Sequence, residues 1–473
     1  IDKVNDGKVH VVVNKIDKAN NISSKIYDRV FDPIVTKELQ LYGLEGRDSF
    51  VVKGGNSPIK VRIIGGPGND HFVNQGTDVN VLVYDVTFED NQFIGDETGF
   101  KKKLSPDPRV NAYNRLFYKY GYFHPGVSFA YNVDDGLFLG LKSEGITHGF
   151  RKEPYEMRQY LNVNHALRTS SYRFRYEADY IKPFGLSDIL VRADVRAPIN
   201  VTNFFGYGNN TVFDKNAGRG AEYYRTRYDI ANLSVLLRRQ LQSWMRVHYG
   251  AAMQYFRIEK EHNIGKFVSN TQNNGLDSTS LYNGKWYAGA AFLMDINSRN
   301  NQVLPTRGFK LDAGARSLFG LNQLSQNVTQ LHWDMNVIAS FTPLSKMVYA
   351  LRFGVGHNIG KFEMPQAQYL SGTENLRGYR RNRFAGRTVV YQNTELRYKL
   401  ADFTTYFFPG AIGIQVFNDV GRVWMDSEAS KKWHVGYGAG IWVSPIKRLV
   451  VTGSVANSKE EKLLPYFTFG FQF

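Results

Sequence analysis

The sequence contains no cysteine and no long apolar run, and both absences narrow what the chain can be. With 0 Cys among 473 residues, disulfide bonds and thiolate-bound metal sites are excluded. No uninterrupted apolar window of about 18 residues occurs, so a transmembrane helix is not expected. A mean hydropathy of -0.37 is typical of soluble proteins. A transmembrane β-barrel, however, alternates lipid-facing and lumen-facing residues, so its mean hydropathy hides its apolar face.

Acidic residues are also few relative to basic ones. The chain has 43 Asp and Glu against 59 Lys and Arg, which gives a formal charge of +16. Such a charge fits nucleic acid, anionic lipid or a basic pore lining. Because the basic residues are interleaved along the chain and not gathered on one face, nucleic-acid binding is not expected. The ten histidines form no HExxH motif, and no Ser-His-Asp arrangement can be nominated. The sequence therefore predicts neither an enzyme nor a cofactor.

Strict alternation of apolar and polar residues is the main structural signal. The final segment PYFTFGFQF puts Phe467, Phe469, Phe471 and Phe473 on one face, with Gly470 on the other. Similar segments recur at roughly 22-residue intervals, which suits strands of about ten residues with their connections. Sixteen candidate strands result: 124–133, 136–146, 156–167, 171–182, 187–197, 222–237, 242–257, 284–298, 308–318, 328–342, 346–357, 388–400, 411–424, 436–445, 447–456 and 465–473.

These strands predict an all-β fold with two domains. Residues 122–473 are expected to form a 16-stranded antiparallel transmembrane β-barrel, and residues 1–121 a small β-rich domain and linker. A soluble β-sandwich is the alternative, but Phe and Tyr are unusually abundant for one. Short connections at Val133-Asp134-Asp135-Gly136 and Ser444-Pro445 are interpreted as periplasmic turns. The long segments are interpreted as extracellular loops: 198–221, 258–283 and 358–387.

One of these loops, GTENLRGYRRNRFAGR at 372–387, carries five arginines. Parity turns Glu395 and Asp419 towards the lumen from adjacent strands, and we expect Arg377 to bind both. A guanidinium offers five donors in a fixed fork and stays charged away from water. Gly378 would allow close approach of the loop, and Tyr379 would place its ring against the barrel wall. The remaining arginines are expected to be solvated or to face other lumen groups: Arg380, Arg381, Arg383 and Arg387.

At these residues the chain resembles the BamA superfamily of bacterial surface antigens. Leu376 to Tyr379 resembles the family's sixth-loop motif, and FNDVG at 417–421 resembles its later FxDxG strand motif. NTELR at 393–397 resembles the intervening strand, LPTRG at 304–308 the turn that opens a mid-barrel strand, and Phe473 the C-terminal signal. The resemblance implies a sixteen-stranded outer-membrane barrel whose motif arginine pairs with the strand aspartate.

The resemblance also implies a function. Such barrels insert or translocate proteins through a lateral gate between the first and last strands, here at Phe467, Phe469, Gly470, Phe471 and Phe473. Outer-membrane lipid, client outer-membrane proteins and accessory subunits would be the partners. The location would be the bacterial outer membrane, with the N-terminal domain in the periplasm.

An alternative function is a membrane anchor or secretion pore for an attached domain. Residues 131–140 and 148–155 resemble the C-terminal half of fusions in which a calcineurin-like metallophosphoesterase precedes such a barrel. The phosphoesterase motifs GDxH and GNH are absent, so that domain would lie upstream of Ile1, where the sequence starts without a leader. The family's insertases carry POTRA domains with paired helices, and residues 1–121 contain no pair of amphipathic helical patterns.

Instead, the N-terminal residues contain a repeat. The segments 39–54 and 61–76 align about 22 residues apart, which predicts a small β-sandwich or solenoid. GGPGNDHFV at 65–73 fits a calcium-binding nonapeptide, which makes Asp70 a calcium candidate. Those sites need copies about nine residues apart, however, and none follows at that spacing. Turn geometry is therefore the preferred account of this motif, and no metal is expected.

Overall fold

In the computed structural model the described residues are all of 1–473 except 18–20, 133–134, 343–345, 373 and 427. They form two compact units, Ile1–Lys119 and Tyr120–Phe473, each of which is built mainly of strands. Within the described part of the chain, no helix is long and apolar enough to cross a membrane.

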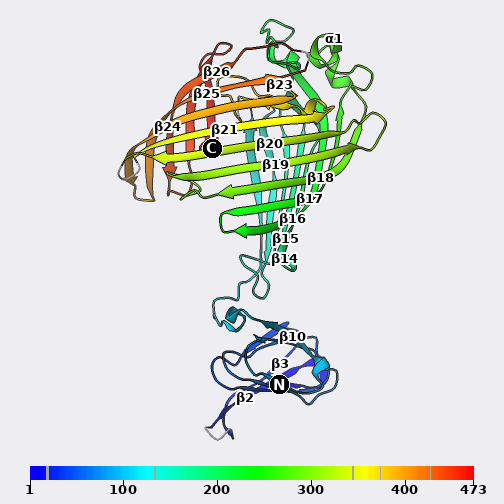
Figure 1. Cartoon of the computed structure of the whole chain (residues 1–473), viewed down its shortest axis with the longest axis vertical. Coiled ribbons are helices and arrows are strands. Elements are labelled where there is room, and N and C mark those ends of the chain that lie inside the picture. The colour runs from blue at the N-terminus through cyan, green and yellow to red at the C-terminus, as the bar shows by residue number, and fades with distance from the viewer. Residues whose placement is uncertain (18–20, 133–134, 343–345, 373, 427) are drawn as a thin grey trace. The chain divides into compact units, whose positions relative to one another are not determined.

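The larger unit is a sixteen-stranded antiparallel sheet that curves round on itself, with strands adjacent in chain order (Figure 1). This confirms the predicted fold, although several strands extend past their predicted ends. The strands are β11 Tyr122–Asn132, β12 Gly136–Thr147, β13 Met157–Ala166, β14 Tyr172–Phe184, β15 Ser187–Asn203, β16 Arg225–Gln242, β17 Met245–Ile258, β18 Lys285–Asn297, β19 Gly308–Gly320, β20 Val328–Ser340, β21 Met347–Gly360, β24 Thr388–Thr404, β25 Pro409–Trp424, β26 His434–Pro445, β27 Val451–Ser458 and β28 Leu464–Phe469.

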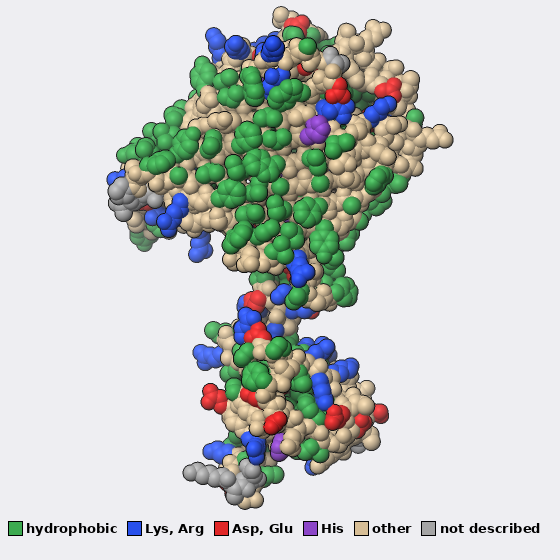
Figure 2. All heavy atoms as spheres, in the orientation of Figure 1, with side chains coloured by type: hydrophobic (Ala, Val, Ile, Leu, Met, Phe, Trp, Pro, Cys, Tyr) green, Lys and Arg blue, Asp and Glu red, His purple; other side chains and the backbone are tan. Residues whose placement is uncertain are grey.

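Alternation along each strand separates an inner from an outer face. In β25 the side chains of Gln415, Phe417 and Asp419 are buried, whereas Ile414 and Val416 are exposed. The buried set faces the lumen because it contacts the loop that enters it, described below. Exposed hydrophobic side chains cover the visible outer face of the large sheet (Figure 2). A polar lumen and an apolar exterior are typical of a barrel surrounded by lipid.

Strand order corrects one prediction about the connections. The predicted turn Val133-Asp134-Asp135-Gly136 includes residues 133 and 134, which lie outside the described residues. Its flanking strands β11 and β12 are described, and they are the first pair of the sheet. In an antiparallel sheet, successive connections alternate between the two ends. The β11–β12 connection therefore lies at the end that carries the three long loops, opposite the turn after Ser444-Pro445.

The long loops pack together at that end of the sheet. The loop between β21 and β24 contains the 3-10 helix η8 (Met364–Gln366) and two short paired strands, β22 (Gln368–Leu370) and β23 (Phe384–Gly386). The loop between β17 and β18 carries the helix α1 (Thr271–Asn274). Side chains from these loops and the strands below form one buried cluster, which includes Phe204, Phe256, Val268, Leu281 and Met364. The barrel interior is thus filled from this side.

The first and last strands of the sheet are not paired with each other in the described residues. β11 pairs with β12 alone, and β28 pairs with β27 alone. β28 has 6 residues, against 11 in β11. The sheet therefore keeps two free edges at this position, which we call the seam.

The chain beyond β28 corrects the prediction that four phenylalanines share one face. Gly470 has φ +95°, a left-handed conformation that reverses the direction of the chain at little cost for glycine. Phe467 and Phe469 remain exposed. Phe471 instead contacts the buried Trp442, and Phe473 packs on the lumen-facing side chains of Ile338, Val348 and Ala350. The prediction is wrong for Phe471 and Phe473, because a single positive φ breaks the two-residue period.

The N-terminal unit is a solenoid, one of its two predicted forms. Parallel strands stack in two sheets: β4 (Glu38–Tyr42), β6 (Lys60–Ile64), β8 (Val81–Val86) and β10 (Phe100–Ser105) in one, and β5 (Ser49–Gly54), β7 (His71–Asn74) and β9 (Gln92–Gly95) in the other. The second sheet is extended by β1 (Asp2–Lys3), β2 (Val9–Ile16) and β3 (Ile22–Phe31). Phe50, Phe72 and Phe93 stack at 5.5 and 5.0 Å between ring centroids, one from each coil. The predicted repeat therefore corresponds to one solenoid coil.

Candidate functional site

The arginine-rich segment between β22 and β23 folds back into the lumen. Leu376 and Phe384 are fully buried, and they pack with Leu370, Val389 and Val423 in one apolar cluster. The paired strands β22 and β23 hold the two ends of the segment together. A loop with apolar anchors at both ends can carry a charged residue into the barrel without losing its position.

Arg377 is the charged residue at the centre of this loop. Its Nε and Nη2 donate to Asp419 Oδ2 and Oδ1, both at 2.8 Å, and Nη1 donates to Glu395 Oε2 at 2.8 Å. The backbone N–H of Arg377 also donates to Asp419 Oδ2, at 2.9 Å. Asp419 is thus bound in a bidentate way, which is the strongest geometry for a guanidinium and a carboxylate. The structure brings Arg377 together with the two carboxylates that parity had turned towards the lumen, as expected from the sequence.

A second arginine balances the charge of this cluster. Arg397 Nε donates to Glu395 Oε1 at 2.6 Å, so two arginines face two carboxylates. Glu395 and Asp419 are almost completely buried, at 1% and 0% exposure. The Arg377 guanidinium also lies 3.5 Å from the centroid of the Phe417 ring, in a cation–π contact. Buried charges of this kind are tolerated because each one has hydrogen-bonded partners of opposite sign.

Gly378 and Tyr379 make close contacts with the last three strands. Gly378 has φ +91°, and a Cβ there would lie 2.6 Å from the backbone oxygen of Asn457 in β27. Its N–H donates to the hydroxyl of Tyr466 in β28 at 3.0 Å, and that hydroxyl donates to the Tyr379 carbonyl at 3.1 Å. The Tyr379 ring lies edge-on to His434 of β26, 5.8 Å between centroids. Glycine is required at 378 by both backbone conformation and space.

Arg383 distinguishes between the two expectations for the other arginines. It is 1% exposed, and its Nε and Nη2 form a bidentate pair with Glu460 at 2.6 and 2.8 Å. Its Nη1 and Nη2 also donate to the side chain and backbone of Thr211. Arg380 pairs with Glu461, and Arg387 with Asp426, at partly exposed positions. Arg383 is therefore a second buried anchor of the loop, and of the two expectations for the remaining arginines, solvation or contact with other groups of the barrel, it follows the second.

Most of the loop residues described above contact the hairpin of β27 and β28. Glu460 and Glu461 lie in the connection between the two strands, and Tyr466 lies in β28 itself. Beyond the strand, Gln472 Nε2 donates to the Glu374 carbonyl of the loop at 2.8 Å. The loop thus links the last hairpin to the buried carboxylates of β24 and β25.

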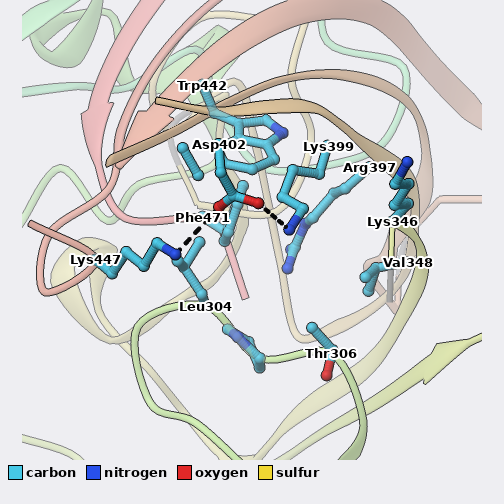
Figure 3. A pocket seen from close by; sticks show the side chains of 12 residues that line it. Leu304, Thr306, Lys346, Val348, Arg397, Lys399, Asp402, Trp442, Lys447 and Phe471 are labelled. Carbon is cyan, nitrogen blue, oxygen red and sulfur yellow. Dashed lines mark hydrogen bonds and ion pairs between the residues drawn. The ribbon is translucent and has the colours of Figure 1, made fainter. Parts of the chain in front are cut away.

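The chain after Gly470 contributes a further contact inside the barrel. The Arg397 guanidinium lies 3.7 Å from the Phe471 ring centroid, and its Nη2 donates to the Phe473 backbone oxygen at 3.0 Å. Phe471 and Arg397 line a cavity of about 150 Å³ together with Trp442 and Leu304 (Figure 3). Leu304 belongs to the LPTRG segment, whose Gly308 begins β19. Two of the sequence motifs thus meet the end of the chain in one place.

Several contributors to this site escaped the sequence reasoning. Gly436 is one, because a Cβ there would lie 1.7 Å from the Arg377 carbonyl, and a single sequence gives no signal for such an approach. Tyr466 is another, because its partners lie more than 80 residues away in the chain. Arg397 could have been found, because it shares the lumen-facing parity of Glu395.

Asp70 lies apart from this site, in the N-terminal unit, where it is completely buried between β6 and β7. Across the described ranges, no group of three or more His, Asp or Glu side chains is arranged to hold a metal ion. The surroundings of Asp70 are treated separately below.

Comparisons with known proteins show the family and the fold of the chain. A family model described as the Omp85 superfamily domain matches residues 150–473. A comparison with curated protein sequences gave no significant match. Among solved structures, BamA from Haemophilus ducreyi lacking POTRA domains 1–3 is similar with a TM-score of 0.52 and 12% identity, over 74% of this chain and 70% of that one. At this identity the likeness concerns the fold alone.

Two further solved structures are similar to a lesser degree. CdiB from Acinetobacter baumannii has a TM-score of 0.46 and 13% identity, over 74% of this chain and 59% of that chain. CdiB from Escherichia coli has a TM-score of 0.48 and 12% identity, over 79% of this chain and 65% of that chain. Nothing below rests on these two likenesses.

Proposed function

The chain belongs to the Omp85 superfamily, and from that premise we propose that it inserts or translocates proteins at the outer membrane through a lateral gate between β11 and β28. The observation that carries this proposal is the seam. Both seam strands present unpaired backbone groups on their outer edges in the described residues. An unpaired edge is a template onto which a client strand can add by backbone hydrogen bonding.

The short last strand supports this role. β28 has 6 residues, so even full pairing across the seam would supply few ladder bonds. The chain then leaves the sheet at Gly470, which shortens the edge further. Opening such a seam costs less than separating β24 from β25, which have 17 and 16 residues. Local opening of low-stability segments is how a closed barrel can admit another strand.

The loop cluster of Arg377, Gly378, Tyr379, Glu395 and Asp419, here called the loop lock, supports the same function. It binds the Tyr466 hydroxyl of β28 from inside the barrel, so the last strand keeps its place while its outer edge stays free. In this proposal the loop lock sets the resting position of the gate. The role is non-enzymatic, with outer-membrane lipid around the apolar outer face, client outer-membrane proteins or accessory subunits as partners, and the N-terminal unit in the periplasm.

A membrane anchor or secretion pore for an upstream metallophosphoesterase-like domain is the second candidate. It is favoured by the N-terminal unit, whose described residues form a solenoid without the paired helices of the POTRA domains found in the family's insertases. In this alternative the barrel holds or exports the attached domain, and the seam takes no part in the assembly of other barrels.

The absence of native cysteine makes the seam directly testable. The variant Val127→Cys/Phe469→Cys places one thiol on each seam strand, to be joined by a short bifunctional maleimide. The purified chain is reconstituted into lipid vesicles, and a urea-unfolded eight-stranded barrel protein serves as the client. We expect the unlinked variant to accelerate client folding at least fivefold over empty vesicles, and we expect the cross-link to abolish that acceleration.

The matched control joins two strands that are already paired. Ala315 and Leu331 lie opposite each other in β19 and β20, so Ala315→Cys/Leu331→Cys with the same cross-linker should keep full activity. Equal acceleration with the seam open and cross-linked would eliminate the lateral gate. No acceleration by any variant, together with a barrel that is folded by its heat-modifiable gel migration, would favour the anchor.

A further inference from the structure

The turns of the N-terminal solenoid are joined by a ladder of hydrogen bonds from backbone N–H groups to side-chain oxygens of the next coil. The Asp48 N–H donates to Asp70 Oδ1 of the next coil at 2.8 Å. The Asp70 N–H donates in turn to Asn91 Oδ1 of the third coil, also at 2.8 Å. These bonds explain why a short polar side chain is needed at Asp70 and at Asn91. They use only one oxygen of the Asp70 carboxylate.

Two carboxylate oxygens of this unit converge on one point. Asp70 and Asp85 are both 0% exposed, and the Oδ2 atom of each has no hydrogen-bond partner. A Cβ built on Gly65 would lie 2.1 Å from Asp85 Oδ2 and 2.3 Å from Asp70 Oδ2. The two oxygens therefore converge beside the Gly65 Cα, and any side chain at position 65 would clash with both of them.

No cation offsets these charges within the described contacts. Asp85 Oδ1 accepts from Asn111 Nδ2 and from the Val86 N–H, both at 2.8 Å. Asp48 Oδ2 and Glu89 Oε2 are also buried without a partner. Burial raises the pKa of Asp70 to about 7, and the neighbouring carboxylates of Asp85, Asp48 and Glu89 contribute in the same direction. Burial also raises the pKa of Asp85. Unpaired buried carboxylates are costly unless they are protonated or bind a metal.

A neutral side chain next to these carboxylates, that of Asn111, also has a buried oxygen without a hydrogen-bond partner. Asn111, in the 3-10 helix η3 (Pro108–Asn111), donates through Nδ2 to Asp85 and to the Gly66 carbonyl. Its Oδ1 is buried with no partner, and the residue is 8% exposed. An amide that turns its donor to the protein and keeps its acceptor unused fits a site that lacks a positive ligand.

We propose that the two converging oxygens, Asp70 Oδ2 and Asp85 Oδ2, are the central ligands of a divalent cation of the calcium class. Every candidate donor here is an oxygen, and calcium takes oxygen ligands at about 2.3–2.6 Å in irregular geometry. Because two carboxylates, and not three, lie at the centre, the remaining ligands are amide or main-chain oxygens and water. Glu89 and Asp48 supply further negative charge next to the ion.

This site differs from the one that the nonapeptide motif predicted. The motif required a second copy about nine residues on, whereas the second carboxylate is Asp85, near the end of β8 in the next coil. Turn geometry, the preferred sequence interpretation, accounts for the ladder bonds to Asp70 Oδ1 and Asn91 Oδ1. It does not account for the buried oxygens that face Gly65.

The test uses the full chain in detergent micelles. Calcium chloride is titrated by calorimetry at pH 7.5 after removal of metals with a chelator, and hydrogen exchange is followed in peptides that contain the Asp48 and Asp70 amides. We expect saturable binding of about one ion per chain, and at least tenfold slower exchange of those amides with calcium than with chelator.

Two variants and a matched control complete the test. Asp70→Asn and Asp85→Asn should each weaken calcium binding at least tenfold, whereas Glu97→Gln, an exposed acid of the same unit paired with Lys102, should bind as the parent chain does. If the two carboxylates share a proton instead, calcium will change neither heat nor exchange, and Asp70→Asn will slow exchange in chelator. That result overturns the proposal. If a variant fails to fold, the calcium titration of the parent chain alone decides.

Discussion

The two sides of the barrel wall next to the arginine loop are built very differently. On one side, β24 and β25 pair over nearly their whole length and carry the buried Glu395 and Asp419. On the other side, β28 has 6 residues and a free edge in the described residues. The loop joins the two sides. Arg377 binds Asp419 of β25, and the Gly378 N–H donates to the Tyr466 hydroxyl of the seam strand β28.

This difference indicates how a barrel can be stable as a whole and yet be able to open at one position, the seam. Buried, charge-balanced contacts fix the loop to the long strands, where removing a partner is expensive. The last strand depends on a few hydroxyl and backbone contacts, each of which is worth about 1 kcal/mol. Stability is therefore unevenly distributed round the sheet, as expected for a wall with one movable segment.

Removal of the Arg377 side chain should lower the free energy of unfolding more than the other substitutions. Arg377→Ala leaves Asp419 and Glu395 buried without their main partner, which should cost about 3–5 kcal/mol of unfolding free energy. Arg377→Lys should recover only part of it, because a point charge cannot reproduce the bidentate pair. Urea unfolding in detergent, followed by tryptophan fluorescence, measures both. The control is Arg380→Ala, whose partly exposed pair should be worth about 0–1 kcal/mol. Equal losses in the Ala variants would contradict the account.

Removal of Arg383 should have the next largest effect. Arg383→Ala loses a bidentate pair with Glu460 and two bonds to Thr211, which should cost about 2–3 kcal/mol, since hydrogen bonds to charged groups are the strong ones. Because Glu460 lies just before β28, hydrogen exchange should accelerate in residues 459–466 more than in β25. A loss below about 0.5 kcal/mol would restore the interpretation that this arginine is solvated.

Substitution of Gly378 tests whether the loop must touch β27. Gly378→Ala forces a side chain into φ +91° and against the Asn457 carbonyl, which should cost about 1–3 kcal/mol. Gly453→Ala is the control, because a Cβ at 453 meets nothing within 4 Å and its φ is not positive. The difference in urea midpoint between these variants is the measurement. A Gly378→Ala chain as stable as Gly453→Ala would show that the close approach is not required.

The smallest expected effect is at the bridge to the seam itself. Tyr466→Phe removes the hydroxyl that accepts from Gly378 and donates to Tyr379, at a cost of about 1–2 kcal/mol. Client folding in vesicles should change in rate, because β28 loses its inner attachment. Tyr437→Phe, an exposed tyrosine of β26, is the control and should leave both stability and rate unchanged. A Tyr466→Phe chain with an unchanged rate would separate the loop lock from the gate.

The sequence predicted those features that depend on local period and missed those that depend on one dihedral or a distant partner. Sixteen strands and the inward parity of Glu395 and Asp419 follow from two-residue alternation, and the resemblance of the loop and strand motifs to the BamA superfamily is confirmed by the family match. Phe471 and Phe473 were misplaced because Gly470 adopts a positive φ. The partner of Arg383 could not be named because Glu460 is 77 residues away.

Hydrogen exchange of the intact barrel in lipid tests the lateral gate most directly, because it compares the seam strands β11 and β28 with the fully paired strand β25 in one sample. The peptides to compare are 464–469 of β28 and 123–131 of β11 against 412–420 of β25. We expect both seam peptides to exchange at least tenfold faster than the β25 peptide. Arg377→Ala should increase the difference in exchange rate between the β28 and β25 peptides. Equally slow exchange in all three peptides would mean a closed, fully paired seam, and it would contradict the lateral gate.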